Sequence, residues 1–248
     1  MTMRLLALLA GLAIAQGALA DELRVLSSTG VKSALTDLIP QFERASGHKV
    51  AIVYDTGNNV VTRMKKGESA DMVILTGPAM DDALKLGKIA GSPAVLARSG
   101  IGLGSRAGAP KPDIRTVDGL KKALLDARSI AYSTTGASGV VFEKLIDQLG
   151  VGEQVRAKAR RPTGGGASEM VAKGEAEMSV QQGPEILDVP GVQLIGMLPR
   201  EVQVYTTFPA ALTADSKQPT AAKQFIAFLS TPAAAKAMQA KGMELPQQ

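Results

Sequence analysis

The chain has 248 residues, with 28 Lys and Arg against 23 Asp and Glu, and it contains no cysteine. The lack of cysteine excludes disulfides, thiolate metal sites, a cysteine nucleophile and the lipid-modified cysteine of an anchored lipoprotein. The formal net charge of +5 comes from scattered basic residues, and aromatic residues make up only 3% of the chain, so nothing indicates nucleic-acid binding.

The first twenty residues have the three zones of a secretory signal peptide. Arg4 precedes the apolar stretch 5–15, and Ala18-Leu19-Ala20 supplies small residues for cleavage. We expect cleavage after Ala20 and a mature chain of residues 21–248. The apolar stretch is too short to span a membrane, and no later segment has about eighteen uninterrupted apolar residues. The sequence therefore predicts a soluble protein of the periplasm.

Short apolar runs and helical patterns alternate in the next part of the chain. The predicted elements are strand 23–26, helix 31–42, strand 50–54, helix 60–66, strand 71–75 and helix 80–86. Right-handed crossovers between such strands give a parallel sheet with helices on both faces. Ligands of these sheets bind at the carboxyl ends of the strands.

A longer apolar run, residues 94–106, leads into the Gly/Pro-rich segment 107–112, which suits a crossing between two lobes. The second series is helix 117–127, strand 129–133, helix 139–149, strand 157–161, helix 167–172 and strand 177–181. The β-rich segment 202–212 is long enough to cross back, and helices 220–229 and 232–240 close the chain.

These elements predict an α/β fold of two lobes, each a mostly parallel sheet flanked by helices, joined by two crossing strands. Residues 21–106 and 202–248 are expected to form lobe one, and residues 107–201 to form lobe two. A single domain is the alternative, because about 100–200 residues per domain is the usual prior.

Four loops rich in Ser, Thr and Gly each open a predicted helix. They are residues 27–30 (S-S-T-G), 55–58 (D-T-G-N), 132–139 (Y-S-T-T-G-A-S-G) and 162–168 (P-T-G-G-G-A-S). A helix N-terminus presents unpaired N–H groups and positive dipole, so small polar residues there suit an anion. Ordinary helix capping is the alternative for any one loop. Their recurrence predicts a ligand cleft.

The candidate ligand-binding residues come from these loops and from the end of the strand 177–181. They are Ser27, Ser28, Thr29, Gly30, Lys32, Thr56, Gly57, Asn58, Ser133, Ser138, Gly139, Gly164 and Gln182. Lys32 is either a solvated surface lysine or a cation that supplies charge to a multivalent carboxylate. Because strand side chains alternate between faces, one of Gln181 and Gln182 is expected to face the ligand, and we assign Gln182.

We expect no metal and no cofactor. His48 is the only histidine and lies in a turn that ends a helix, so no paired histidines can make a transition-metal site. Neither H-E-x-x-H nor G-x-S-x-G occurs in the chain, which argues against metalloprotease and hydrolase activities.

Several separated phrases resemble the periplasmic solute-binding proteins of ABC importers, in the branch named after molybdate binding. They are L-R-V-L-S-S-T-G, G-E-S-A-D-M-V-I, R-A-G-A-P-K-P-D-I, A-S-G-V-V-F and G-E-A-E-M-S-V-Q-Q. The resemblance spans essentially the whole mature chain. It implies a type II binding protein, monomeric, that captures a small anion and delivers it to an ABC permease in the inner membrane.

Molybdate binders of this family hold a tetrahedral dianion with serine hydroxyls, backbone N–H groups and a tyrosine. The positions that resemble the two serines and the tyrosine carry Gly30, Gly57 and Gln182 here. Hydroxyls remain next to them on residues 27–29 and on Thr56. We therefore expect an organic carboxylate or another oxyanion to bind through a shifted set of donors, and molybdate to bind poorly.

Three of the phrases look more like a sub-branch that includes a periplasmic aconitate isomerase. Isomerising trans- to cis-aconitate moves a proton across an allylic system, which requires a group that removes and returns a proton. The sequence assigns no residue to that role. An isomerase in the same cleft is the first alternative to ligand capture, and a ligand sensor that docks on a membrane receptor is the second.

Overall fold

The computed structural model describes residues 22–162 and 166–245. The predicted signal peptide, residues 1–20, and its cleavage site lie outside the described residues, as does Gly164. Within the described ranges no helix is both long and apolar enough to cross a membrane.

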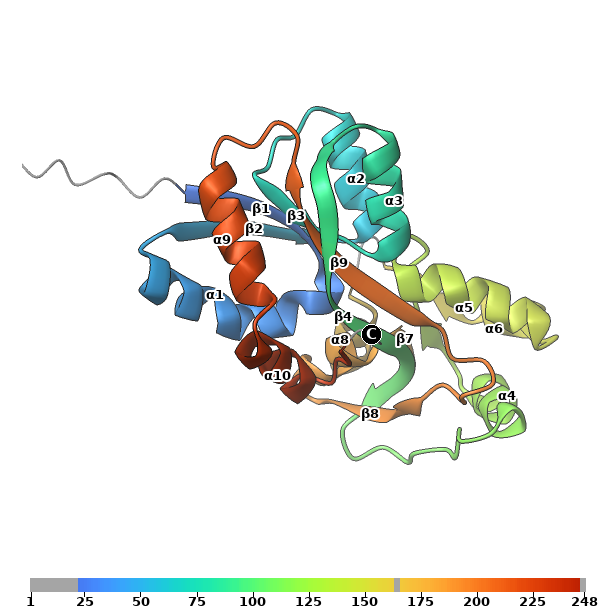
Figure 1. The fold of residues 1–248 in the computed structure, drawn as a ribbon. Helices are drawn as coiled ribbons and strands as arrows, with labels where there is room; N and C mark the ends of the chain where they lie inside the picture. Colours follow the sequence, from blue (N-terminus) through green and yellow to red (C-terminus); the bar gives the residue numbers. More distant parts are fainter. Residues whose placement is uncertain (1–21, 163–165, 246–248) are drawn as a thin grey trace, which may run out of the picture.

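The first lobe is a sheet with helices on both faces (Figure 1). Its strands run in the order β2 (Lys49–Asp55), β1 (Glu22–Ser28), β3 (Met72–Ile74), β9 (Tyr205–Thr213) and the first part of β4 (Ile89–Arg106). The helices on one face are α1 (Lys32–Ser46), α9 (Pro219–Leu229) and α10 (Pro232–Ala240). Those on the other face are α2 (Gly57–Lys65) and α3 (Gly77–Lys85).

Helix α1 illustrates why these segments fold as they do. Leu35, Leu38 and Phe42 recur at helical spacing and are buried against the sheet. The helix ends at Gly47, whose φ of 76° lies in the left-handed region that glycine adopts without a Cβ penalty. A short 3-10 turn, η1 (Thr29–Val31), joins β1 to α1, so the first Ser/Thr/Gly loop lies at the carboxyl end of β1.

The second lobe has the same layered plan. Its strands run in the order β4, β7 (Met178–Gln182), β5 (Ile130–Ala131) and β6 (Ala159–Arg160), and β8 (Val192–Met197) pairs with β4. The helices on one face are α4 (Val117–Asp126), α5 (Ala137–Gln148) and α6 (Gly152–Ala157). Helix α7 (Ala167–Lys173) packs on the other face, and the short α8 (Gly183–Leu187) follows β7 directly.

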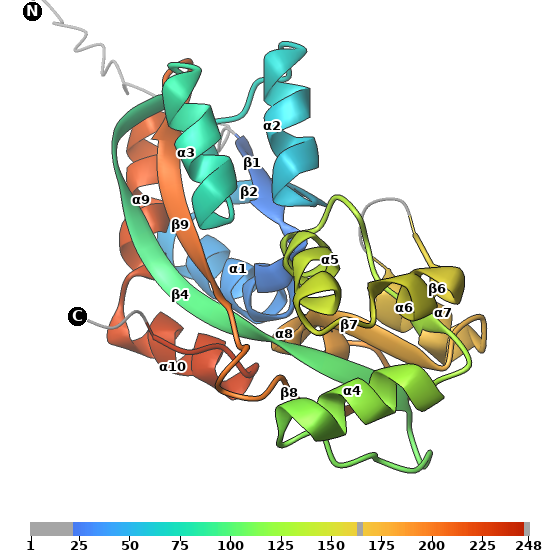
Figure 2. The same ribbon diagram turned by 90° about the vertical axis from the view of Figure 1, so that its right-hand side faces the viewer.

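Strands β4 and β9 link the two lobes (Figures 1 and 2). The first part of β4 pairs with β9, whereas its second part pairs with β7 and β8. Every antiparallel pair in this sheet system involves β4 or β9, and the pairs between the remaining described strands are parallel. Gln203 reinforces the crossing, because its side-chain amide accepts from Ile101 N (2.9 Å) and donates to Ile101 O (2.9 Å).

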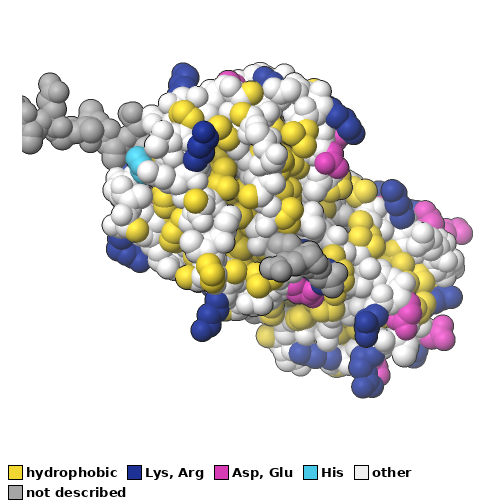
Figure 3. Space-filling view, in the orientation of Figure 1, with side chains coloured by type: hydrophobic (Ala, Val, Ile, Leu, Met, Phe, Trp, Pro, Cys, Tyr) yellow, Lys and Arg dark blue, Asp and Glu magenta, His cyan; other side chains and the backbone are white. Residues whose placement is uncertain are grey.

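The predicted two-lobed α/β architecture is confirmed. Three short elements, α6, α8 and β8, were not predicted, and the predicted strand 157–161 shrinks to the two residues of β6 because α6 occupies the residues before it. The lobe boundaries at 106/107 and 201/202 stay predictions. On the face drawn in Figure 3, Lys and Arg side chains are scattered over both lobes, with acidic side chains among them, and form no single basic patch.

Candidate functional site

A small cavity of about 30 Å³ lies between the lobes, where α5 of the second lobe lies below α2 and beside the end of β1 (Figure 2). Its residues from the first lobe are Ser28, Thr29, Gly30, Thr56, Gly57, Thr76 and Phe208, and those from the second are Ser133, Gly136, Ala137, Ser138, Gln181, Gln182 and Glu185. We call this space the interlobe cavity. Its volume has room for roughly two water molecules.

Several helices begin at this cavity. Ser28 precedes η1 and α1, Thr56 is the N-cap of α2, Thr76 is the N-cap of α3, and Gly136 is the N-cap of α5. Their free N–H groups and positive dipole ends favour a negative ligand. The second strand-end loop, predicted from residues 55–58, therefore meets the first and third loops at one place.

The hydroxyl of Ser28 has no hydrogen-bond partner among the described residues, although the residue is only 2% exposed. A buried polar atom without a partner costs roughly 1–3 kcal/mol, so a native fold retains one where a ligand or water completes it. Ser28 lines the interlobe cavity, so a small molecule bound there could accept a hydrogen bond from this hydroxyl.

Gly57 explains how the hydroxyls are arranged without the family's second serine. A Cβ atom built on Gly57 would lie 2.7 Å from Thr76 Oγ1 and 3.3 Å from Ser28 Oγ. Two hydroxyls thus occupy the space where a side chain at position 57 would project. Thr76, which the sequence analysis did not name, therefore adds a hydroxyl to the cavity wall beside those expected from the sequence.

Phe208 occupies the corresponding space beside Gly30. A Cβ on Gly30 would lie 2.5 Å from Phe208 Cζ and 2.8 Å from Phe208 Cε1. Phe208 is 1% exposed and belongs to β9, so a serine at position 30 requires that a core ring move. Gly30 therefore contributes only backbone atoms to the cavity wall, and the ring of Phe208 stands where a serine side chain at position 30 would lie.

The third loop places Ser133 and Ser138 at the second-lobe wall of the cavity. Ser133 Oγ accepts from Gly136 N at 3.1 Å, so it also caps the turn before α5. Gly139 packs against this turn: a Cβ there would lie 1.5 Å from Ser133 O. Gly139 is thus required for the close turn and is not among the cavity-lining residues.

Gln182, the predicted ligand-binding glutamine, lines the interlobe cavity, and its side chain also has protein partners. With the amide oriented to satisfy its neighbours, Oε1 accepts from Thr206 Oγ1 (2.9 Å), while Nε2 donates to Ser99 O (3.0 Å) and Gly100 O (3.1 Å). Gln182 therefore ties β7 to the crossing strands β4 and β9. Gln181 Oε1 accepts from Ser168 N (2.7 Å) at the start of α7, so both glutamine side chains have protein partners.

Glu185 is the one titratable residue among those that line the interlobe cavity within the described parts of the chain. Its Oε1 accepts from Thr29 Oγ1 of the other lobe (2.7 Å), and its Oε2 accepts from Gln182 N (3.2 Å). Burial raises the pKa of Glu185, with a contribution from Glu169, while the two hydrogen bonds oppose that rise. Part of its surface stays accessible, as expected for a side chain that lines a cavity.

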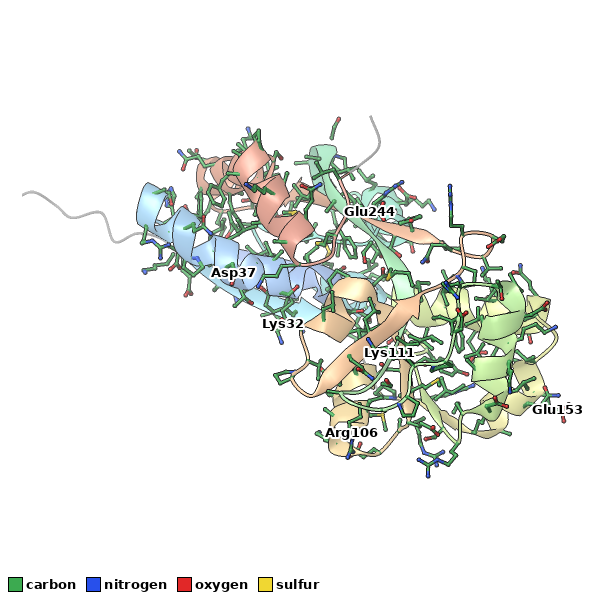
Figure 4. The ribbon with its side chains drawn as sticks, turned by 90° about the horizontal axis from the view of Figure 1, so that it is seen from below. Lys32, Asp37, Arg106, Lys111, Glu153 and Glu244 are labelled. Carbon is green, nitrogen blue, oxygen red and sulfur yellow. The ribbon has the colours of Figure 1, made fainter. Side chains whose placement is uncertain are left out.

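A second cavity of about 70 Å³ adjoins the first, and Thr29, Gln181 and Glu185 line both. Lys32 lines this adjoining cavity, and Figure 4 shows it at the first-lobe side next to elements of the second. It shares that space with three carboxylates, those of Glu169, Glu185 and Asp188. Lys32 therefore lies beside the interlobe cavity rather than in it.

Three predicted residues have other surroundings. Ser27 is fully buried on the opposite side of β1, where its hydroxyl donates to Ser28 O (3.1 Å). Asn58 bridges the lobes at the surface, because its Nδ2 donates to Thr135 O (3.2 Å). Gly139 supports the turn described above, and Gly164 lies outside the described residues.

Sequence reasoning missed Thr76, Glu185 and Phe208. The Thr76-Gly77 pair repeats the pattern of Thr56-Gly57 after the next strand, so it carried a usable signal. Glu185 stands three residues after Gln182, which is the spacing of a capping box and signals a helix start. Phe208 had no signal, since only the tertiary structure brings β9 beside η1.

The interlobe cavity is lined mainly by neutral donors. Among the described residues, no group of three or more His, Cys, Asp or Glu side chains is placed to hold a metal ion. Hydroxyls and N–H groups can bind an anion by hydrogen bonds without a countercharge, as at other helix termini. The carboxyl of Glu185 can in addition accept or donate a proton.

A much larger depression, about 840 Å³, lies elsewhere on the second lobe. We call it the lobe-two basin; it is lined by residues 105–106, 109–112, 123, 126–129, 160, 174 and 176–178. Figure 4 shows Arg106 and Lys111 on this lobe. Size alone favours the basin, but among the described residues no buried side-chain polar atom of the basin lacks a hydrogen-bond partner, so we place the functional site in the interlobe cavity.

Comparison with known proteins gives a consistent picture. Residues 23–244 match the family model described as bacterial extracellular solute-binding protein. A relative named aconitate isomerase, from Pseudomonas sp., is 34% identical over 229 residues, which cover 90% of this chain and 87% of the relative.

Two solved structures show the same fold. The periplasmic molybdate-binding protein of Azotobacter vinelandii has a TM-score of 0.76 at 20% identity, covering 91% of this chain and 100% of that one. The sulfate-binding protein of Mycobacterium tuberculosis has a TM-score of 0.73 at 19% identity, covering 90% of this chain and 86% of that one. At these identities the likeness shows the fold alone.

Proposed function

The chain belongs to the bacterial extracellular solute-binding protein family, and from that premise we propose that it captures a small organic carboxylate in the interlobe cavity for an ABC importer. The observation that carries the proposal is the unpartnered Ser28 hydroxyl, buried in a cavity where helices from both lobes begin. An anion there receives hydrogen bonds from both lobes, which holds the lobes together.

A polycarboxylate is larger than the cavity of about 30 Å³, so the lobes must separate for it to enter and must stay further apart around it than they lie here. Opening breaks two hydrogen bonds between the lobes, Thr29 to Glu185 and Asn58 to Thr135. The linking strands β4 and β9, with Gln182 and Gln203 bound across them, are the natural hinge. When the lobes close on the ligand, the liganded protein differs in shape from the ligand-free protein, and a permease can distinguish the two.

A carboxylate is favoured over a compact tetrahedral oxyanion by the cavity's composition. Gly30 and Gly57 leave no serine hydroxyls at the positions that resemble the family's molybdate ligands, and Phe208 adds an apolar wall. An apolar wall suits the carbon skeleton of an organic acid better than the oxygen surface of molybdate or sulfate.

Calorimetry on the mature chain, residues 21–248, tests this proposal. The panel contains molybdate, sulfate, succinate, tricarballylate and trans-aconitate. We expect a carboxylate to bind. At a ligand concentration of a hundred times Kd, binding should increase the free energy of unfolding by about 2.7 kcal/mol and so raise the melting temperature. Tight molybdate binding without any carboxylate response contradicts the choice of ligand, and no binding by any member contradicts capture of these anions.

A second candidate function is isomerisation of aconitate in the same cavity. The observation that favours it is Glu185, a carboxyl group in a site of otherwise neutral donors. A carboxylate repels a bound anion, so its presence is unexpected in a site that only captures anions. The 34% identity to the relative named aconitate isomerase also supports isomerisation as the second candidate function. Proton NMR of trans-aconitate with catalytic amounts of the protein tests it: cis-aconitate should appear with time.

Localisation follows from the family and from the first twenty residues. We propose export to the periplasm with cleavage after Ala20, by the small-residue pattern Ala18-Leu19-Ala20. Intact-mass measurement on a periplasmic extract should give a chain that begins at Asp21. A mass that retains residues 1–20 in that extract contradicts the cleavage.

A further inference from the structure

We propose that Glu185 is a catalytic residue that carries one proton between two carbon atoms of an unsaturated polycarboxylate bound in the interlobe cavity. This inference rests on the second proposed function and names the group that performs it. The substrate class is a di- or tricarboxylate with a CH₂ group between a carboxylate and a carbon–carbon double bond.

The position of Glu185 is the first argument. Its side chain lines both the interlobe cavity and the adjoining cavity, so it stands in the wall between the two spaces. The other residues that line the interlobe cavity are Ser, Thr, Gly, Ala, Gln and Phe, none of which titrates near neutral pH. Among these residues, Glu185 is therefore the one group that can take a proton from carbon.

The fixed orientation of the carboxyl is the second argument. Oε1 is held from lobe one by Thr29 Oγ1 (2.7 Å), and Oε2 is held from its own helix by Gln182 N (3.2 Å). The second of these bonds is ordinary capping of α8. The first joins the two lobes, so the position of the carboxyl depends on the distance between the lobes.

The surrounding charges are the third argument. Lys32 from α1, Glu169 from α7 and Asp188 from α8 line the adjoining cavity beside Glu185. Burial, and then Glu169, raise the pKa of the Glu185 carboxyl. A carboxylate with a raised pKa is a stronger base than one in water, which suits removal of a weakly acidic C–H proton.

The proposed step balances. The C–H bond of the CH₂ group breaks, its electron pair delocalises over the three-carbon allyl unit, and an O–H bond forms on Glu185. The proton then returns to the other terminal carbon, the double bond moves by one position, and Glu185 is again a carboxylate. No oxidant, reductant or second substrate takes part. Hydroxyls and N–H groups at the helix starts face the negative charge that develops on the ligand.

Glu185→Gln in the mature protein tests the proposal, because glutamine keeps the shape and removes the base. The probe is trans-aconitate in D₂O, followed by NMR for double-bond position and for deuterium uptake. We expect isomerisation and exchange to fall about 10²- to 10⁴-fold, the usual contribution of a general base. Calorimetry should give a Kd for trans-aconitate within about threefold of wild type or tighter, since a charge that repels the anion is gone.

Glu153→Gln is the matched control, because it removes a carboxylate of the second lobe that lines neither the interlobe cavity nor the adjoining cavity. Its rate should stay within about threefold of wild type. Glu185→Asp retains a carboxylate and should recover part of the rate lost in Glu185→Gln. In wild type the rate should rise with pH through a pKa above 4.5, and this limb should vanish in Glu185→Gln.

The outcomes separate the two proposals. If wild type binds trans-aconitate but neither isomerises it nor exchanges its protons, the catalytic role of Glu185 is wrong and ligand capture stands. If Glu185→Gln folds, binds and turns over at the wild-type rate, the role is also wrong. If no polycarboxylate binds to wild type, the proposed function itself fails.

Discussion

The interlobe cavity and the lobe-two basin differ in a way that size does not predict. The basin is about 840 Å³ and the cavity about 30 Å³. In the basin, however, Arg128 pairs with Glu177 (3.1 Å) and the buried Ser105 accepts from Gln193 Nε2 (3.2 Å). In the cavity, Ser28 has no partner in the described structure.

This difference teaches that unmet polar groups, rather than volume, mark a ligand site. Burying a hydroxyl without a partner lowers stability, whereas the groups of the basin stabilise one another or face water. A ligand recovers the most free energy where the fold has left hydrogen-bonding groups unsatisfied. The following predictions can break or sharpen this comparison.

Ser28→Ala should have the largest effect: it should weaken ligand binding but leave the stability of the ligand-free protein the same or higher. Carboxylate binding should weaken by about 1.5–3 kcal/mol, roughly 10- to 150-fold, the range for a hydrogen bond to a charged group. The ligand-free protein should unfold at the same or a higher temperature, because an unpartnered buried hydroxyl is removed. Calorimetry and thermal unfolding check both signs. Ser105→Ala in the basin is the control and should leave binding unchanged.

Gly30→Ala should lower the free energy of unfolding by about 1–3 kcal/mol, because its Cβ would lie 2.5 Å from Phe208 Cζ. Binding should weaken as the ring moves in the cavity wall. Phe208→Leu combined with Gly30→Ala should recover part of the lost stability, since the two sites share one space. Denaturant unfolding of the single and double variants decides this, and strictly additive losses would show that the ring is not the obstacle.

The pH dependence of stability should reveal the raised pKa of Glu185. The pKa of Glu185 is higher in the folded state than in the unfolded state, because the folded state holds the proton more tightly. The free energy of unfolding therefore falls as pH rises from the unfolded-state pKa to the folded-state pKa. Glutamine does not titrate. The melting temperature of Glu185→Gln minus that of wild type should therefore increase as pH rises above the ordinary glutamate pKa of about 4.3.

Glu143 of the second lobe is a control, because its pKa is lowered rather than raised and the pH dependence of stability should have the opposite sign. Despite its burial, hydrogen bonds from Tyr132 and Arg156 and the charge of Arg161 lower the pKa of Glu143. Its stabilising contribution is present above the unfolded pKa and is lost as pH falls through the lowered value. The melting-temperature difference for Glu143→Gln should therefore become more negative as pH rises. Parallel trends in both variants would contradict the assignment for Glu185.

Arg128→Ala in the basin should have the smallest effect. Its ion pair with Glu177 is exposed, and such pairs contribute under about 1 kcal/mol to stability. Carboxylate binding should not change, because the pair is not part of the interlobe cavity. A loss of binding in Arg128→Ala, measured by the same calorimetry, would return the basin to consideration as a ligand site.

The sequence by itself determined the alternating β-α order and the approximate place of each major helix, although α2, α3 and α5 begin two or three residues before the predicted starts. Period and capping are local properties, so the loops that contain Ser28 and Thr56 could be placed before helices from their immediate neighbours. The first two Ser/Thr/Gly loops meet because the parallel neighbours β1 and β2 end at one edge of their sheet, and the third, which follows β5 of the second lobe, meets them where the two lobes face each other. The short elements α6, α8 and β8 were missed, since they are too brief for a periodic signal.

Only the tertiary structure decided which polar groups stay unsatisfied. Ser27 and Ser28 are adjacent and chemically alike, yet one donates to backbone and the other faces the cavity unpartnered. The side chain of Gln182 forms hydrogen bonds with the crossing strands. Glu185 lines the interlobe cavity because the end of β7 and the start of α8 lie against Thr29 of the first lobe. Hydrogen-bond partners and burial depend on contacts between segments far apart in the chain, and these arise only when both lobes pack around the crossing strands.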